Sequence, residues 1–270
     1  MVGIVPDVAA AIWDTMVQDF MPVPRKDDWK VIADVFAEKW QFPHCVGAID
    51  GKHIAIKAPG RSGSLFRNYK GYFSIVLLAV ADANHLFRVV DIGAYGGGSD
   101  GGVLAVSHFG RALREGTLDL PNDAPLPNAE HLGPLPYVFV GDQAFPLRRD
   151  LLRPYTRQSL HTDWHRIYNY RLSRARHIVE SSFGVLTSRF RVYHGVIELN
   201  PDHAEKVVKA TTILHNFLSW GQQHIANIPD AAGGAARRPF AGREERYIQD
   251  SFMEYFNSPG GAVPWQYDYF

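Results

Sequence analysis

The sequence predicts an α/β fold with a mixed sheet flanked by helices. Five segments are predicted to be strands, and they span residues 46–58, 73–82, 87–93, 135–140 and 191–199. Amphipathic periodicity typical of helices occurs over residues 7–20, 27–40, 166–186 and 203–220. Because residues 73–82 are apolar nearly throughout, this strand is expected at the centre of the sheet, covered by helices on both faces.

Composition limits the class of protein. With 270 residues and 46% hydrophobic content, the chain can bury one large core, or one core with an appendage. Its single cysteine, Cys45, excludes an intramolecular disulfide and favours a reducing intracellular compartment. No uninterrupted apolar run approaches the roughly 18 to 20 residues of a membrane span, so no membrane association is expected. A formal net charge of zero argues against a protein that coats nucleic acid along its whole surface.

Two helices precede the main domain. Apolar residues recur at helical spacing over residues 7–20, and Pro22 and Pro24 end this helix. The second helix has Trp29 and Phe36 on its apolar stripe and ends before Pro43. A strand that contains Asp50 follows directly.

The middle of the chain is predicted to be an antiparallel meander followed by a glycine-rich loop. Residues 73–82 and 87–93 are its second and third strands. The loop Gly96-Gly-Gly-Ser-Asp-Gly101 formally fits a dinucleotide-binding motif, with Asp119 at a suitable distance for a ribose contact. The preceding strand is third in a meander and does not open a βαβ unit, so we favour a helix capped by Ser99 or Asp100.

The second half combines a long connection with further helices. Residues 116–136 are rich in Pro, Gly and Asn and form a lid or a surface excursion. The strand that ends at Gly141-Asp142 is expected to lead into a helix or turn through Pro154. Residues 191–199 are predicted to form a strand before the closing helix. Beyond Gln223 we expect a linker over 226–242, a short charged helix over 243–256 and an aromatic tail over 265–270.

Three carboxylates are the candidate functional groups. Asp50 and Asp142 lie at or near the ends of apolar strands, and Glu180 lies in a basic amphipathic helix. Carboxylates without a Cys/His cage suit Mg²⁺ or Mn²⁺. Two such ions could support in-line attack on a phosphodiester, with Asp50 bridging both ions and Asp142 and Glu180 each binding one. Lys52, Arg174 and Arg176 would hold phosphates.

Each of these residues also has a purely structural interpretation. Asp50 before Gly51 could be a turn residue, and Asp142 could cap the helix that follows. Glu180 could only pair with Arg176 on the helix surface. His53 and His177 are more readily explained as packed or surface histidines.

The segment 148–191 is the candidate surface for a polyanion. It contains ten Arg, no Lys and three acidic residues, a local excess of seven positive charges. The planar guanidinium suits bidentate contact with phosphate. The alternative is a solvated helix face with intrachain ion pairs.

An ordered set of motifs resembles one family. The motifs are Phe42-Pro-His-Cys-Val-Gly-Ala-Ile-Asp-Gly-Lys-His53, Asn68-Tyr-Lys-Gly71, Val140-Gly-Asp-Gln-Ala-Phe145, Asn169-Tyr-Arg-Leu-Ser-Arg-Ala-Arg176, Glu180-Ser-Ser-Phe-Gly184 and Leu214-His-Asn-Phe217. Together they resemble the PIF/Harbinger transposases and the host-domesticated nuclease-like proteins derived from them. The resemblance extends from about Trp29 to Trp220.

This resemblance implies a ribonuclease-H-like fold with a D-D-E metal triad at Asp50, Asp142 and Glu180. Asp100 matches a further acidic position of the family and is an additional candidate ligand. The implied domains are an N-terminal helical segment over 1–41, a catalytic domain over 42–222, and a linker with a C-terminal tail over 223–270. Only a short stretch precedes the catalytic domain, where family members usually carry a helix-turn-helix region.

The implied function is that of a divalent-metal-dependent DNA nuclease or transposase core that cuts DNA phosphodiesters, with joining of strands left open. The alternative is a domesticated nuclear adaptor that binds a Myb/SANT-like partner protein without cleavage. Expected partners are DNA and such a protein, with a homo-oligomer left open. The expected location is the nucleus, with the cytoplasm as a second site.

Overall fold

The computed structural model describes residues 3–220 and 242–268, and these fall into two compact units. Unit 1 contains the described parts of residues 1–23, 50–114 and 179–230. Unit 2 contains the described parts of residues 24–49, 115–178 and 231–270. The domain limits expected at residues 42 and 222 stay a prediction. Among the described helices, none is both long and apolar enough to cross a bilayer.

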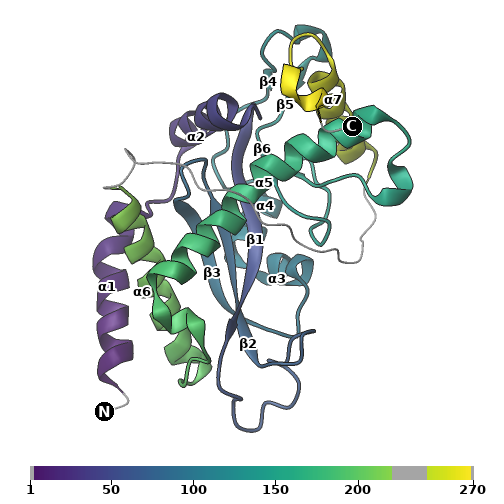
Figure 1. Cartoon of the computed structure of the whole chain (residues 1–270). Coiled ribbons are helices and arrows are strands. Elements are labelled where there is room, and N and C mark those ends of the chain that lie inside the picture. Colours follow the sequence, from purple (N-terminus) through teal and green to yellow (C-terminus); the bar gives the residue numbers. More distant parts are fainter. Residues whose placement is uncertain (1–2, 221–241, 269–270) are drawn as a thin grey trace. The chain divides into compact units, whose positions relative to one another are not determined.

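Unit 1 is built on a strand pair that is covered by helices. Its complete strands and helices are β2 (Ser74–Ala81), β3 (Phe87–Tyr95), α1 (Ile4–Phe20), α3 (Asp100–Val106), α4 (His108–Glu115, whose last residue belongs to unit 2) and α6 (Pro201–Trp220). It also contains residues 50–55 of β1 (Cys45–Ala55) and residues 179–189 of α5 (Asp163–Arg189). Every residue of β2 is buried, as its uniform apolar sequence predicts. Helix α6 packs on β3 and β2, and α1 lies beside α6 (Figure 1). A 3₁₀ turn over Arg191–His194 precedes α6.

Unit 2 is held together by aromatic contacts. Its elements are α2 (Lys26–Trp40), β4 (Ala124–Pro125), β5 (Pro134–Leu135), β6 (Val138–Val140), β7 (Leu151–Leu152), α7 (Arg243–Asn257) and 3₁₀ turns over Glu130–Leu132, Arg157–Ser159 and Pro264–Tyr267. Trp29 of α2 packs edge-on against Phe139 of β6, with ring centroids 5.6 Å apart. Phe42 lies 4.9 Å from Phe256 of α7 by the same measure. The predicted C-terminal helix is therefore part of a core.

The sheet has five strands in the order β3-β2-β1-β6-β7, where β1 spans Cys45–Ala55. Strands β2 and β3 pair antiparallel, whereas β1 pairs with β6, and β6 with β7, in parallel. The sheet is therefore mixed and flanked by helices. This confirms the predicted α/β class and is the arrangement expected of a ribonuclease-H-like fold.

A buried arginine connects α5 (Asp163–Arg189) to the C-terminal segment within unit 2. Arg171 is 1% exposed and donates to the backbone oxygen of Gly261 at 3.1 Å and to Oε1 of Gln266 at 2.9 Å. It also donates to the backbone oxygen of Gln41. Its guanidinium lies 4.4 Å from the centroid of the Phe256 ring. Burial lowers the pKa of this arginine to about 10.

One sequence-based prediction about the fold is wrong, and one strand was missed. Residues 191–199 do not form a strand: they begin with the 3₁₀ turn, and Ile197 makes one parallel bridge to Ile56. The hydroxyl of Tyr193 hydrogen-bonds to Thr211 of α6, so the first part of this segment is held by the helix. Strand β7 was not predicted, because a strand of two residues carries no periodicity. The predicted linker, apart from Gly242, lies outside the described residues.

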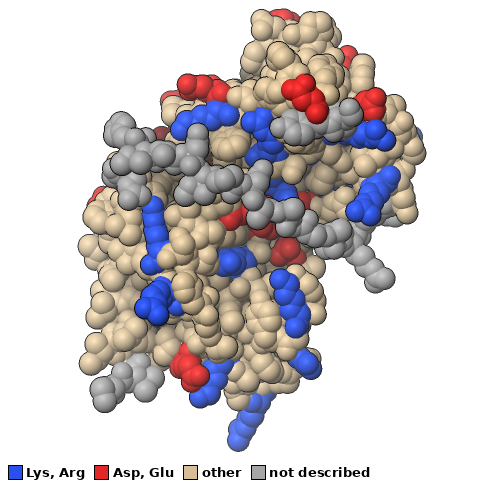
Figure 2. All heavy atoms as spheres, in the orientation of Figure 1, with Lys and Arg blue, Asp and Glu red and all other residues tan. Residues whose placement is uncertain are grey.

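Charged side chains of both signs occur on the face drawn in Figure 2. Toward the end of unit 1 that carries the β2 label in Figure 1, Lys and Arg prevail over Asp and Glu. A local basic surface is thus compatible with a formal net charge of zero.

Candidate metal centre

The register of two parallel strands brings the first pair of predicted carboxylates together. Ala48 of β1 pairs with Val140 of β6, and Asp50 and Asp142 each follow two residues later. Neighbouring strands lie roughly 4.8 Å apart, so side chains at matching positions leave the sheet close together. Asp50 is in the interior of β1, which excludes the turn that its neighbour Gly51 had suggested.

A glycine allows the third carboxylate to approach β1. Asp100 is the first residue of α3, and the N-cap Ser99 accepts a hydrogen bond from the amide of Gly102 at 3.2 Å, as predicted. A Cβ atom on Gly51 would overlap Oδ1 of Asp100, far inside the 3.0 Å that real Cβ contacts keep. Gly51 is therefore explained by this close approach.

Asp142 is positioned by a tight turn after β6. Its Oδ1 accepts a hydrogen bond from the amide of Ala144 at 2.8 Å, the pattern of an Asx turn. A Cβ on the preceding Gly141 would lie 2.9 Å from the ring of Phe145 and 3.1 Å from Ile49. The predicted capping role is thus present, at a turn and not at a helix.

The three aspartates form a compact group. One carboxylate oxygen from each of Asp50, Asp100 and Asp142 lies within 4.8 Å of the others, and all three residues are partly exposed. Glu180 is not a member of this group, although it is partly exposed on α5. The group contains only oxygen donors, the ligand type that Mg²⁺ and Mn²⁺ prefer.

Comparison with known proteins decides the family. The family model described as "DDE superfamily endonuclease" matches residues 49–216, which is more than half of the chain. The chain belongs to this DDE superfamily. It is also similar to "Putative nuclease HARBI1" of Rattus norvegicus, with 27% identity over 208 residues, covering 76% of this chain and 54% of the relative.

Further relatives agree. The protein of the same name from Homo sapiens is 26% identical over 191 residues, covering 70% of this chain and 50% of the relative. The Xenopus laevis protein is 24% identical over 230 residues, covering 82% of this chain and 58% of the relative. The chain thus spans about half the length of the curated relatives that it matches. No solved structure matches it. The predicted relationship to Harbinger-derived nucleases is confirmed.

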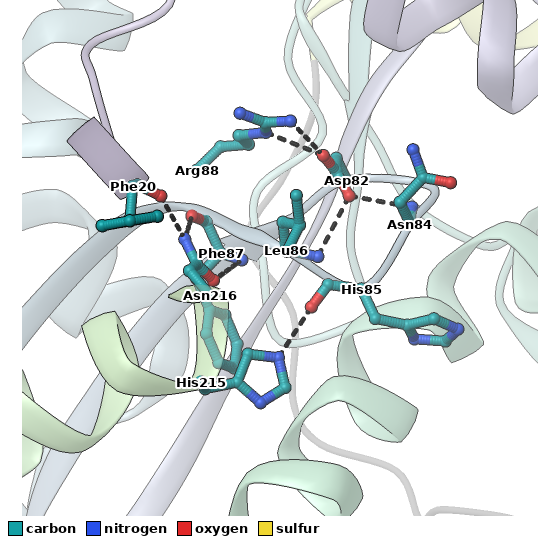
Figure 3. A network of polar contacts seen from close by, with 9 residues as sticks. All are labelled: Phe20, Asp82, Asn84, His85, Leu86, Phe87, Arg88, His215 and Asn216. Carbon is teal, nitrogen blue, oxygen red and sulfur yellow. Dashed lines mark hydrogen bonds and ion pairs between the residues drawn. The ribbon is translucent and has the colours of Figure 1, made fainter. Parts of the chain in front are cut away.

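The Leu214-His-Asn-Phe217 motif of this DDE superfamily member has a structural role (Figure 3). The Asn216 side chain donates to the backbone oxygen of Phe87 at 2.7 Å and accepts from its amide at 2.9 Å, as a neighbouring strand would. It also donates to the oxygen of Phe20 at the end of α1. The side-chain amide of Asn216 therefore joins the edge strand β3 to the helices α1 and α6.

Lys52 is held on the same strand as Asp50. Burial lowers its pKa, the negative charge of Asp50 opposes this shift, and Lys70 adds to it. The Lys52 ammonium lies 5.8 Å from the centroid of the Phe183 ring on α5. Phe183 follows Glu180 by three residues, or nearly one helical turn. Within unit 1 this contact brings the Glu180 turn of α5 toward β1.

The two predicted arginines differ in what surrounds them. The guanidinium of Arg174 lies 3.9 Å from the centroid of the Trp265 ring, so the C-terminal segment covers one of its faces. Sequence periodicity could not have revealed this contact, because the two residues are 91 positions apart. Arg176 is partly exposed on the same helix. Contacts of Lys52, Arg174 and Arg176 with DNA stay predictions.

The dinucleotide interpretation of the glycine-rich loop is not supported. Strand β3, which leads into the loop, pairs antiparallel with β2 and so does not open a parallel βαβ unit. The proposed ribose ligand, Asp119, has a structural partner instead. Its Oδ2 accepts a hydrogen bond from the amide of Lys26, the first residue of α2, at 3.1 Å.

Proposed function

We propose that this DDE superfamily member is a divalent-metal-dependent nuclease that cuts phosphodiester bonds of DNA, with strand joining as a further step. The observation that carries the proposal is the meeting of three aspartates within a region matched by an endonuclease family. Because the chain spans about half the length of the curated relatives, the proposal concerns this part of such a protein.

The residues present fit a hard divalent cation. Oxygen ligands to Mg²⁺ lie roughly 2.1 Å from the ion, so two ligands of one ion are at most about 4.2 Å apart. Oxygens that lie within 4.8 Å of one another need only a small adjustment to reach that range. The partial exposure of all three side chains leaves room for the waters that Mg²⁺ and Mn²⁺ retain.

A pair of such ions, when bound, activates a water and neutralises the leaving oxygen of the phosphodiester. Asp50, Asp142 and Glu180 would hold these ions, with Asp50 shared between them, Asp142 on one and Glu180 on the other. Asp100 adds a further carboxylate beside Asp50. Lys52, with its ammonium near Asp50, holds a phosphate oxygen of the DNA strand.

Nicking of supercoiled plasmid DNA tests the proposal. The wild-type chain should nick DNA in the presence of Mn²⁺ or Mg²⁺ and not in the presence of EDTA. Asp50→Asn, Asp142→Asn and Glu180→Gln should each reduce nicking at least 100-fold, because each removes one charge from the ion site. Asp119→Asn is the matched control, since this aspartate caps α2 and should leave nicking and Mn²⁺ binding unchanged.

The alternative function, a nuclear adaptor without cleavage, predicts the opposite result. An adaptor would bind Mn²⁺ at the same aspartates and show no nicking with or without a Myb/SANT-like partner. Plasmid that stays supercoiled across both metals would therefore refute the nuclease. The protein partner, the homo-oligomer and the nuclear location stay predictions, to be examined by co-purification, light scattering and microscopy.

A further inference from the structure

Tyr69 is the most exposed aromatic side chain among the described residues. It is 82% exposed, whereas the next tyrosine, Tyr247, is 60% exposed. Exposing an aromatic ring forgoes the favourable free energy of burying it. The exposed Tyr69 ring is therefore accessible to a ligand that could cover it in a complex.

The turn that carries Tyr69 is rigidly built. Asn68 is 5% exposed, and its Oδ1 accepts hydrogen bonds from the amides of Lys70 at 3.0 Å and Tyr72 at 3.3 Å. The backbone closes the same turn, because the amide of Gly71 donates to the oxygen of Asn68 at 2.9 Å. Gly71 has a φ of 88°, a conformation that favours glycine. These hydrogen bonds fix the turn and so keep the Tyr69 side chain exposed.

A buried serine fixes this turn to the strand of the metal centre. Oγ of Ser74 is hydrogen-bonded by Nδ2 of Asn68 at 3.1 Å and by Nδ1 of His53 at 2.9 Å. The His53 ring also packs against Tyr69, with centroids 5.8 Å apart and planes at 68°. His53 follows Asp50 by three residues of β1, or roughly 10 Å along the strand. Side chains alternate between the two faces of a strand, so His53 and the Tyr69 ring that packs against it lie on the face of Gly51, which Asp100 approaches, and not on the face of the Asp50 side chain.

A second connection runs through the glycine-rich loop before Asp100. The amide of Gly97 donates to the oxygen of Leu65 at 3.0 Å, and the amide of Gly96 donates to the oxygen of Ser74 at 3.0 Å. A Cβ on Gly96 would overlap Oγ of Ser74, so the two loops are in direct contact. The segment with Tyr69 and the segment that positions Asp100 thus share one hydrogen-bonded framework within unit 1.

The segment that carries Tyr69 is rich in basic residues, of which Lys57 pairs with Glu198 at 3.6 Å. Residues 57–73 contain four Lys or Arg and no Asp or Glu, namely Lys57, Arg61, Arg67 and Lys70. The Lys70 ammonium lies 5.5 Å from the centroid of the Tyr69 ring. At the end of unit 1 that carries the β2 label in Figure 1, Lys and Arg prevail over Asp and Glu on the face drawn in Figure 2. An exposed ring among cations suits a ligand that offers a planar face and phosphates at the spacing of a nucleotide.

We infer that Tyr69 is a stacking platform for an unpaired DNA base beside the metal centre, with Lys70 at the adjoining phosphate. This inference rests on the proposed function and deepens it by naming the form of the substrate. Bases inside a duplex are stacked on one another and offer no free face to the ring. The occupant is therefore a strand end, an overhang or a base turned out of the helix.

Fluorescence anisotropy without divalent metal tests the inference, so that cleavage does not contribute. The probes are a duplex with an overhang of unpaired thymines and a blunt duplex of equal length. Tyr69→Ala should weaken binding of the overhang duplex roughly 5- to 150-fold, the range of one lost base–aromatic stack, and should leave blunt-duplex binding unchanged. Tyr69→Phe keeps the ring and should bind like the wild type.

Tyr247→Ala is the matched control, because it removes a comparably exposed tyrosine from α7 of unit 2 and should change neither affinity. Thermal denaturation should show an unchanged melting temperature for Tyr69→Ala. Wild-type affinity of Tyr69→Ala for the overhang, or equal loss for both duplexes, would overturn the inference. If nicking is absent while Tyr69-dependent binding persists, the nuclease proposal fails and the stacking platform stands.

Discussion

Gly51→Ala tests whether the close approach of Asp100 to β1 builds the metal centre. The added methyl group would overlap Oδ1 of Asp100 and lie 3.1 Å from its Cγ. The obstructing atom is a carboxylate oxygen of Asp100, the first residue of α3, so the Asp100 side chain must rotate or α3 must shift. A displacement on the order of 1 Å removes one oxygen from the group of three.

The expected magnitude follows from that displacement. Misplacing a group by about 1 Å can cost about 100-fold in activity, and disturbing the support of a metal ligand typically costs about 10- to 100-fold in affinity. We therefore expect Gly51→Ala to weaken Mn²⁺ binding by about 10- to 100-fold. Isothermal titration calorimetry with Mn²⁺ measures this directly, independently of any DNA substrate.

Two companion variants make this experiment specific. Gly60→Ala adds the same methyl group where no atom lies within 4 Å, and it should bind Mn²⁺ like the wild type. Asp100→Ala removes the ligand, so adding Gly51→Ala to it should cause no further loss, the non-additivity expected of two residues in contact. Wild-type Mn²⁺ affinity in Gly51→Ala would refute the role that we assign to this glycine.

Two further predictions concern stability, measured by urea unfolding. Arg171→Ala should lower the free energy of unfolding by about 2–4 kcal/mol, because it removes the donor to the buried oxygen of Gly261 and leaves Oε1 of Gln266 only its longer hydrogen bond from the Val263 amide. Arg166→Ala, which removes an exposed ion pair from the same helix, should change it by less than about 0.5 kcal/mol, and equal losses in both variants would contradict this account. Burial lowers the pKa of His215 to about 4 from 6.5, so the unfolded chain binds its proton more tightly and stability is lost as the pH falls through that window. Between pH 7.5 and 4.5 the wild type should lose about 2 kcal/mol more than His215→Gln, and parallel pH profiles would show that His215 does not titrate in this way.

Elements with a strong periodic signal were predictable from sequence. The uniformly apolar β2 is a buried interior strand, the helices α1, α2 and α6 lie where their apolar stripes predict, and α7 lies where a short charged helix was expected. These features depend on local spacing, which is a property of consecutive residues. Strand β7 and the 3₁₀ turn over Arg191–His194 were missed because tertiary contacts decide both.

The carboxylate site was likewise only partly predictable from the sequence. The sequence alone identified Asp50 and Asp142, because each acid interrupts or follows an apolar strand, and the motif order identified the family. Asp100 was expected only through the family resemblance, since nothing in a glycine-rich loop indicates a ligand.

Only the tertiary structure decided how these acids meet. The parallel register of β1 and β6 aligns Asp50 with Asp142, and the absence of a side chain at Gly51 admits Asp100. It also decided that Trp265 covers Arg174 and that Tyr69 stands exposed on a rigid turn. Register, close approach and exposure each depend on residues far apart in the chain. Local sequence therefore determined which groups this protein carries, and long-range packing determined which of them act together.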